Sequence, residues 1–89
     1  MVSSQITIQN KLGLHARAAT KFASTAGRFG SAIKVTCNGK SIDGKSIMSI
    51  MLLAASKGTE IEIQADGRDE SDALEALLAL INNKFDEEE

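Results

Sequence analysis

The chain has 89 residues, of which 43% are hydrophobic and 25% are charged, and its formal net charge is −2. This length and composition predict one globular domain over residues 1–89, built around a single core. Charges of both signs are mixed along the chain, and three Phe are the only aromatic residues. A nucleic-acid partner is therefore not expected, because such a partner calls for a basic surface with stacking side chains.

The sequence also predicts the compartment and the absence of cofactors. Cys37 is the only cysteine, so it cannot form an internal disulfide, and we expect it to be a small core residue. The longest nearly continuous apolar run, residues 47–55, is far shorter than the roughly 20 residues of a membrane-spanning helix. One His and one Cys do not suffice for a metal cluster. We expect a cytoplasmic protein without metal, cofactor or membrane insertion.

The first half of the chain predicts three strands and a helix. Residues 4–9 alternate between apolar and polar side chains, as half-buried strands do. Residues 16–26 are predicted to be helical, because small and apolar side chains recur there at helical spacing: Ala19, Phe22, Ala23 and Ala26. Residues 32–37 alternate again, and Asn38-Gly39 is a strong signal for a hairpin that leads into a short strand at 40–42.

The second half predicts a short helix, a strand and a longer helix. Residues 47–55 are rich in Met, Leu and Ala, so we expect a helix there that ends before Gly58. Its expected core-facing residues are Ile47, Ile50 and Leu53. Residues 60–65 alternate strictly, and a helix with Leu74, Leu77, Leu78 and Ile81 on one face follows, capped by Asp69 or Ser71.

The expected order βαββαβα defines the fold class. Because the strands have one dry face and one wet face, the helices must cover the dry face alone. We therefore predict an α+β open-faced β-sandwich, with a four-stranded antiparallel sheet and three helices on one face. The acidic tail, residues 86–89, is expected to be frayed.

His15, the only histidine, lies where the first helix is predicted to begin. Backbone N–H groups without helical partners and the positive end of the helix dipole meet there, which favours a neutral imidazole and a bound anion. Such an imidazole can accept a phosphoryl group on a ring nitrogen, whose oxygens would meet the N–H groups of Ala16 and Arg17. Arg17 adds a guanidinium clamp. On the residues alone, an ordinary capping His remains equally open.

Two segments together carry a family resemblance. NKLGLHARAATKFA at residues 10–23 and GKSIMSIMLLAASKG at residues 44–58 are similar to the phosphocarrier HPr family of the bacterial phosphoenolpyruvate-dependent phosphotransferase system. The resemblance covers essentially the whole chain and implies the same open-faced β-sandwich. It departs from the family at Ala18, where the family commonly has proline.

The resemblance implies a function for several residues. The chain would be a phosphoryl carrier and not an enzyme, with His15 accepting a phosphoryl group from enzyme I and passing it to IIA components of sugar transporters. Arg17 would assist at the phosphoryl site. Ser46 resembles the family's regulatory serine, the target of an ATP-dependent HPr kinase/phosphorylase, although Ser is also a common helix N-cap.

A docking surface is expected around this site. Met48, Met51 and Leu52 should face water on the second helix, and flexible Met side chains suit a carrier with several partners. We expect these residues to form one interface with further residues of the first helix and its neighbourhood: Ala16, Arg17, Thr20, Lys21 and Lys45. The basic residues among them should steer acidic partners. The less favoured alternative is that a small domain leaves these apolar residues incompletely buried.

Three other functions remain open on the sequence. A nitrogen-type regulatory phosphorelay would share the fold and the phosphohistidine without moving sugar. A self-sufficient phosphotransferase would need a second acid or base beside His15, and none is evident. A structural interaction module would not need His15 at all. A monomer is expected for a carrier that docks transiently.

Overall fold

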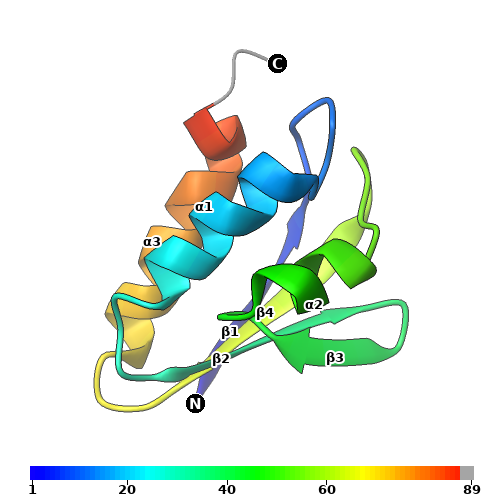
Figure 1. The fold of residues 1–89 in the computed structure, drawn as a ribbon. Coiled ribbons are helices and arrows are strands. Elements are labelled where there is room, and N and C mark those ends of the chain that lie inside the picture. Colours follow the sequence, from blue (N-terminus) through cyan, green and yellow to red (C-terminus); the bar gives the residue numbers. More distant parts are fainter. Residues whose placement is uncertain (87–89) are drawn as a thin grey trace.

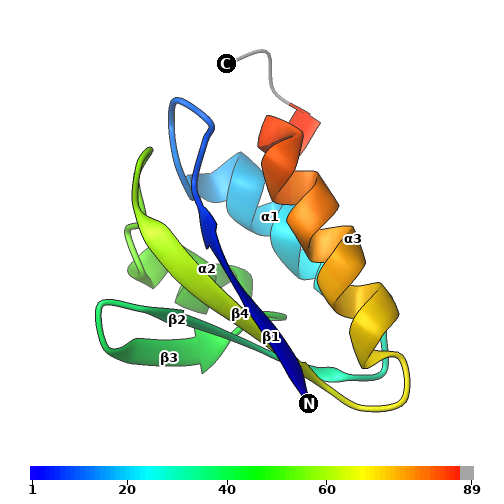
Figure 2. The same cartoon turned by 180° about the vertical axis from the view of Figure 1, so that it is seen from behind.

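The computed structural model describes residues 1–86, and their order of elements is the predicted βαββαβα. The elements are β1 (Val2–Thr7), α1 (Ala16–Ala26), β2 (Ala32–Cys37), β3 (Lys40–Asp43), α2 (Ile47–Leu52), β4 (Glu60–Asp66), α3 (Glu70–Asn82) and the short 3₁₀ turn η1 (Lys84–Asp86). All strand pairs are antiparallel, in the order β1-β4-β2-β3. The helices cover one face of the sheet (Figure 1), and the other face is open (Figure 2). The predicted fold class is confirmed.

β4 is the central strand that organises the core. Ile61 and Ile63 are buried, whereas Glu60 is exposed, as the alternating sequence predicts. Ile61 pairs with Ile6 of β1, and Ile63 pairs with Val35 of β2. The inward side chains of the strands pack against Phe22 of α1 and against residues of α3 in one hydrophobic cluster. The core lies between the sheet and the helices.

β1 begins earlier than the alternation alone predicted. It starts at Val2, because Val2 pairs with Ala65, and its ladder ends at Thr7. Ile8 nevertheless stays attached: its N–H donates to the Thr59 carbonyl at 2.9 Å, and its carbonyl accepts from the Gly58 N–H at 2.8 Å. The chain that leaves β1 is therefore held against the segment that leads into β4.

α2 is shorter than predicted, and one of its residues faces the other way. The helix ends at Leu52, and Ala54 has a left-handed φ of 51°. Ile50 and Leu53 are buried as expected, but the prediction for Ile47 was wrong, because this side chain is 39% exposed. Ile47 is the first helical residue, and helical side chains lean toward the N-terminus, which here carries the side chain past the edge of the core.

Asp69 occupies the N-cap position of α3 without capping that helix through its side chain. Its carboxylate instead accepts hydrogen bonds from the N–H groups of Gly30 at 2.9 Å and Ser31 at 3.0 Å, and from the Ser31 hydroxyl. These donors stabilise the carboxylate, so the pKa of Asp69 is lowered, the Ser31 hydroxyl being the largest cause. The loop after α1 is thereby attached to the start of α3.

The chain after α3 folds back as η1. Phe85 is fully buried beside α1, and its carbonyl oxygen accepts a hydrogen bond from the Lys21 ammonium at 2.6 Å. Asp86 belongs to this turn, and its N–H donates to the Asn83 carbonyl at 2.9 Å. Of the tail predicted to be frayed, residues 87–89 lie outside the described residues.

Candidate functional site

His15 is the N-cap of α1, which begins at Ala16 as predicted. Its backbone is extended, with φ −74° and ψ 179°, and its carbonyl accepts the first helical hydrogen bond from the Ala19 N–H at 2.8 Å. The ring accepts a hydrogen bond at Nδ1 from the Arg17 N–H, with an N–N distance of 3.3 Å. The half-exposed imidazole thus lies with one nitrogen toward the open end of the helix.

This hydrogen bond decides which ring nitrogen has the lone pair. An atom that accepts a hydrogen bond carries no proton, so the neutral ring is protonated on Nε2 and unprotonated on Nδ1. From the sequence we expected the Arg17 N–H to be free for the oxygens of an incoming phosphoryl group. That expectation was wrong for the present arrangement, because the His15 side chain itself occupies this donor, as N-cap side chains commonly do.

Arg17 and Ala18 complete the first turn of α1. Arg17 is exposed, and its guanidinium forms no hydrogen bond or ion pair within residues 1–86. Among residues 1–86, the imidazole thus has an exposed guanidinium two residues away that is bound to no other group. Ala18, where the family commonly has proline, is fully buried, and the helix starts at Ala16 without a proline.

An apolar surface lies on α2, which contacts α1. Met48 is 76% exposed, Leu52 75% and Met51 43%. On the adjacent helix, Ala16 and Thr20 are exposed, and the Thr20 hydroxyl donates to the Ala16 carbonyl at 2.7 Å. The structure therefore exposes Met48, Met51 and Leu52 of α2 and Ala16 and Thr20 of α1 to solvent, as predicted.

Two exposed apolar residues extend this set beyond the predicted one. One is Ile47, at the start of α2, and the other is Leu12, in the loop just before His15, which is 67% exposed. The signal for Leu12 was present in the sequence, because a large apolar residue stands there within the polar turn Asn-Lys-Leu-Gly.

The two lysines expected to steer partners both bind backbone carbonyls. Lys21 is half-buried and bonded to Phe85, as described, and the Lys45 ammonium donates to the Phe29 carbonyl at 2.9 Å. Both ammonium groups keep their charge near the two helices, but each is fixed in position by its acceptor.

Ser46 is the N-cap of α2. Its Oγ accepts a hydrogen bond from the Ser49 N–H at 3.2 Å, and the residue is half-buried. The capping role expected from the sequence is therefore present. Any group added to the Ser46 oxygen would therefore lie at the N-terminal end of α2, the helix that carries the apolar surface.

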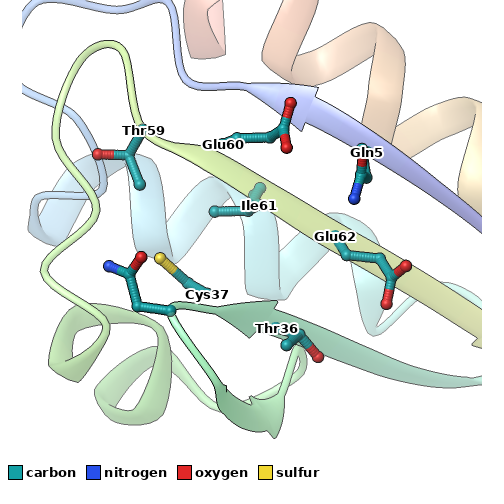
Figure 3. Close-up of a pocket in the computed structure, with 8 residues that line it drawn as sticks. Gln5, Thr36, Cys37, Thr59, Glu60, Ile61 and Glu62 are labelled. Atoms are coloured by element: carbon teal, nitrogen blue, oxygen red, sulfur yellow. The ribbon is translucent and has the colours of Figure 1, made fainter.

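A separate pocket lies where β2 and β4 diverge, beyond the last paired residues Thr36 and Glu62 (Figure 3). Cys37 lines this pocket but is only 3% exposed, in line with the expected core role. None of the predicted site residues lines it. Within residues 1–86, no cluster of three or more His, Cys, Asp or Glu side chains could hold a metal ion, and no helix is long and apolar enough to cross a membrane.

Comparison with known proteins agrees with this geometry. The family model "PTS HPr component phosphorylation site" matches residues 2–83. The phosphocarrier protein HPr of Pseudomonas aeruginosa is 54% identical over 90 residues, which cover 100% of both chains.

Two structures from Thermoanaerobacter tengcongensis, each 46% identical in sequence, are also similar to this chain. The first, an HPr crystal structure, has a TM-score of 0.96 and 100% coverage of both chains. The second, described as an HPr dimer, has a TM-score of 0.79 and covers 98% of this chain and 100% of the other. The chain therefore belongs to the HPr family of phosphocarrier proteins of the phosphotransferase system.

Proposed function

We propose that this chain accepts a phosphoryl group on His15 from phosphorylated enzyme I and passes it to IIA components of sugar transporters. The observation that supports this most is the hydrogen bond from the Arg17 N–H to Nδ1 of His15. It leaves a lone pair on the ring nitrogen that faces the electropositive end of α1. The resemblance to HPr phosphocarriers supplies the partners.

In this proposal Nδ1 is the nucleophile. Its lone pair forms the new N–P bond while the bond from phosphorus to enzyme I breaks, and the Nε2 proton remains on the ring. The Arg17 N–H loses its acceptor as Nδ1 bonds to phosphorus and donates to a phosphoryl oxygen instead. The guanidinium of Arg17, uncommitted within residues 1–86, approaches the same oxygens.

The same proposal assigns partner docking to the exposed face around His15. The side chains of Met48, Met51 and Leu52 supply the apolar contact area, with Ala16 and Thr20 from α1 beside them. Lys21 and Lys45 add positive charge that attracts acidic partners, although their ammonium groups are bound to carbonyls. Docking of this kind is transient, as a carrier in the cytoplasm needs.

Ser46 is proposed as a site of regulatory phosphorylation by an HPr kinase/phosphorylase. Its Oγ already accepts from the Ser49 N–H, so a phosphate there retains acceptor oxygens for the start of α2. It also adds about two negative charges next to Met48. The expected effect is weaker partner binding with little loss of stability.

We propose a monomer as the working state, since His15, Arg17 and the docking face all belong to one chain. A solved HPr relative is described as a dimer, so the state in solution is a separate measurement. Sedimentation at the mass of a single chain would support the monomer, and a dimer at working concentration would contradict it.

Incubation with phosphoenolpyruvate and enzyme I tests the proposed function. The expected product is the chain with one added phosphate, detected by intact mass and lost on mild acid treatment. His15→Ala should remain unmodified under the same conditions while keeping its fold. A purified IIA component should then remove the phosphate. Modification of His15→Ala to the same extent would exclude the proposal.

A further inference from the structure

We infer that Asn10 is a positioning residue for phosphoryl transfer, acting by fixing the backbone that presents His15. This inference rests on the proposed function of His15. Asn10 is fully buried although its side chain is polar. Its side-chain Nδ2 donates to the Gly13 carbonyl at 2.8 Å, and its backbone carbonyl accepts from the Gly13 N–H at 3.2 Å. Side chain and main chain thus close one turn at residues 10–13.

This turn is attached to the chain that leaves α2. The Leu14 N–H donates to the Ala55 carbonyl at 2.9 Å. Gly13 has a φ of +65°, and a Cβ at this position would lie 2.4 Å from the Ala55 oxygen and 2.8 Å from Cα of Ser56. The backbones touch so closely that only glycine fits, and the turn cannot shift without breaking this contact.

The position of His15 follows from these contacts. Leu14 is buried and directly precedes His15, so its hydrogen bond to Ala55 fixes the point at which the chain enters α1. The extended backbone of His15 then brings Nδ1 to the Arg17 N–H. Asn10 acts on the ring through Gly13 and Leu14.

A positioning role has a different signature from a docking role. Asn10 is buried and does not belong to the exposed surface of α2. Its loss should therefore leave the KM for this chain in the enzyme I reaction unchanged, and lower kcat. A misplacement of about 1 Å is enough to lower a rate by up to about a hundredfold, so we expect a loss of kcat between about tenfold and a hundredfold.

The experiment compares Asn10→Ala with the wild type and with Asn82→Ala. Asn82 is a matched control, because it is an exposed amide whose Oδ1 accepts from Gln9 Nε2 at 3.1 Å. Its loss removes an amide hydrogen bond to the residue before the turn and leaves the bonds within residues 10–13 in place. Enzyme I kinetics give kcat and KM. Nitrogen-15 NMR of the imidazole reports the tautomer, which should be mainly Nε2–H in the wild type and in Asn82→Ala, and mixed in Asn10→Ala.

Asn10→Ser is a second variant, milder than alanine because it keeps a polar group in the buried site. It should show the same lower kcat and unchanged KM to a smaller degree. Wild-type kcat and tautomer in folded Asn10→Ala would overturn the inference, as would failure of both variants to fold, since Asn10 would then act in folding. A wild-type chain that takes no phosphoryl group would instead remove the proposed function itself.

Discussion

The backbone N–H of Arg17 donates to Nδ1 of His15 across 3.3 Å, so the two residues are joined through the main chain at the first turn of α1. The hydrogen bond places the unprotonated nitrogen toward the helix end. It also keeps a donor ready that becomes available once this nitrogen bonds to phosphorus. Arg17 thus has two separate roles in the proposed transfer, one through its backbone and one through its guanidinium.

Arg17→Ala should lower the rate of phosphoryl transfer by about tenfold or more, because a hydrogen bond to a charged group contributes about 1.5–3 kcal/mol. The backbone donor is kept, so acceptance should be slowed and not abolished. Rapid-quench kinetics with enzyme I would measure this. Arg28→Ala, an exposed arginine beyond the end of α1, is the control and should transfer at the wild-type rate. Equal rates for both variants would argue against a clamp.

Ser46→Asp and Ser46→Ala separate capping from charge. The aspartate can still accept from the Ser49 N–H, so stability should hold, whereas its charge should slow transfer from enzyme I. Ser46→Ala loses the cap and should lower the free energy of unfolding by about 1 kcal/mol while transfer continues normally. Urea unfolding and transfer kinetics on both variants provide the comparison. Unimpaired transfer by Ser46→Asp would contradict regulation through charge.

Ala54→Gly should stabilise the protein. Ala54 has a φ of 51°, a left-handed conformation that disfavours a residue with a Cβ by roughly 1–2 kcal/mol. Glycine removes this strain but has a more flexible unfolded state, so the expected net gain is up to about 1 kcal/mol. Ala79→Gly, exposed within α3, should instead lose about 1 kcal/mol. Thermal unfolding that shows losses at both positions would refute the strain at Ala54.

Asp69 should make stability sensitive to acid. Its pKa is lowered in the folded chain by the Ser31 hydroxyl and by the Gly30 and Ser31 N–H groups. The folded state therefore binds this proton less readily, and the stabilisation is present above the ordinary carboxyl range near pH 4 and is lost as the pH falls below it. Asp69→Ala should be less stable than the wild type at pH 7, with a smaller difference at pH 3. If urea unfolding gives the same difference in the free energy of unfolding between the two proteins at pH 7 and at pH 3, this pH dependence is contradicted.

Local pattern was sufficient to predict α1 and β4. The predicted bounds of α1, from the apolar stripe and the capping position of His15, agree with the structure to the residue. Strict alternation predicted β4 over residues 60–65, and the strand includes one more residue, Asp66. The bounds of β1 were less accurate, because the pairing of Val2 with Ala65, and not local alternation, sets where that strand begins.

Other features depend on contacts between distant segments and had no local signal. The early end of α2 accompanies the contact of Ala55 with Leu14, which brings two loops together. The bond between Lys21 and Phe85 joins residues 64 positions apart. Asp69 satisfies the predicted capping position but bonds to Ser31, 38 residues away, because that loop offers three donors to one carboxylate.

The most direct test of the central claim is to identify which ring nitrogen of His15 carries the phosphate. The chain would be labelled with nitrogen-15, phosphorylated by enzyme I and phosphoenolpyruvate, and examined by nitrogen and phosphorus NMR. We predict phosphorus bonded to Nδ1, with the proton on Nε2 and a shifted Arg17 N–H signal. Phosphorus on Nε2, or on a residue other than His15, would contradict it.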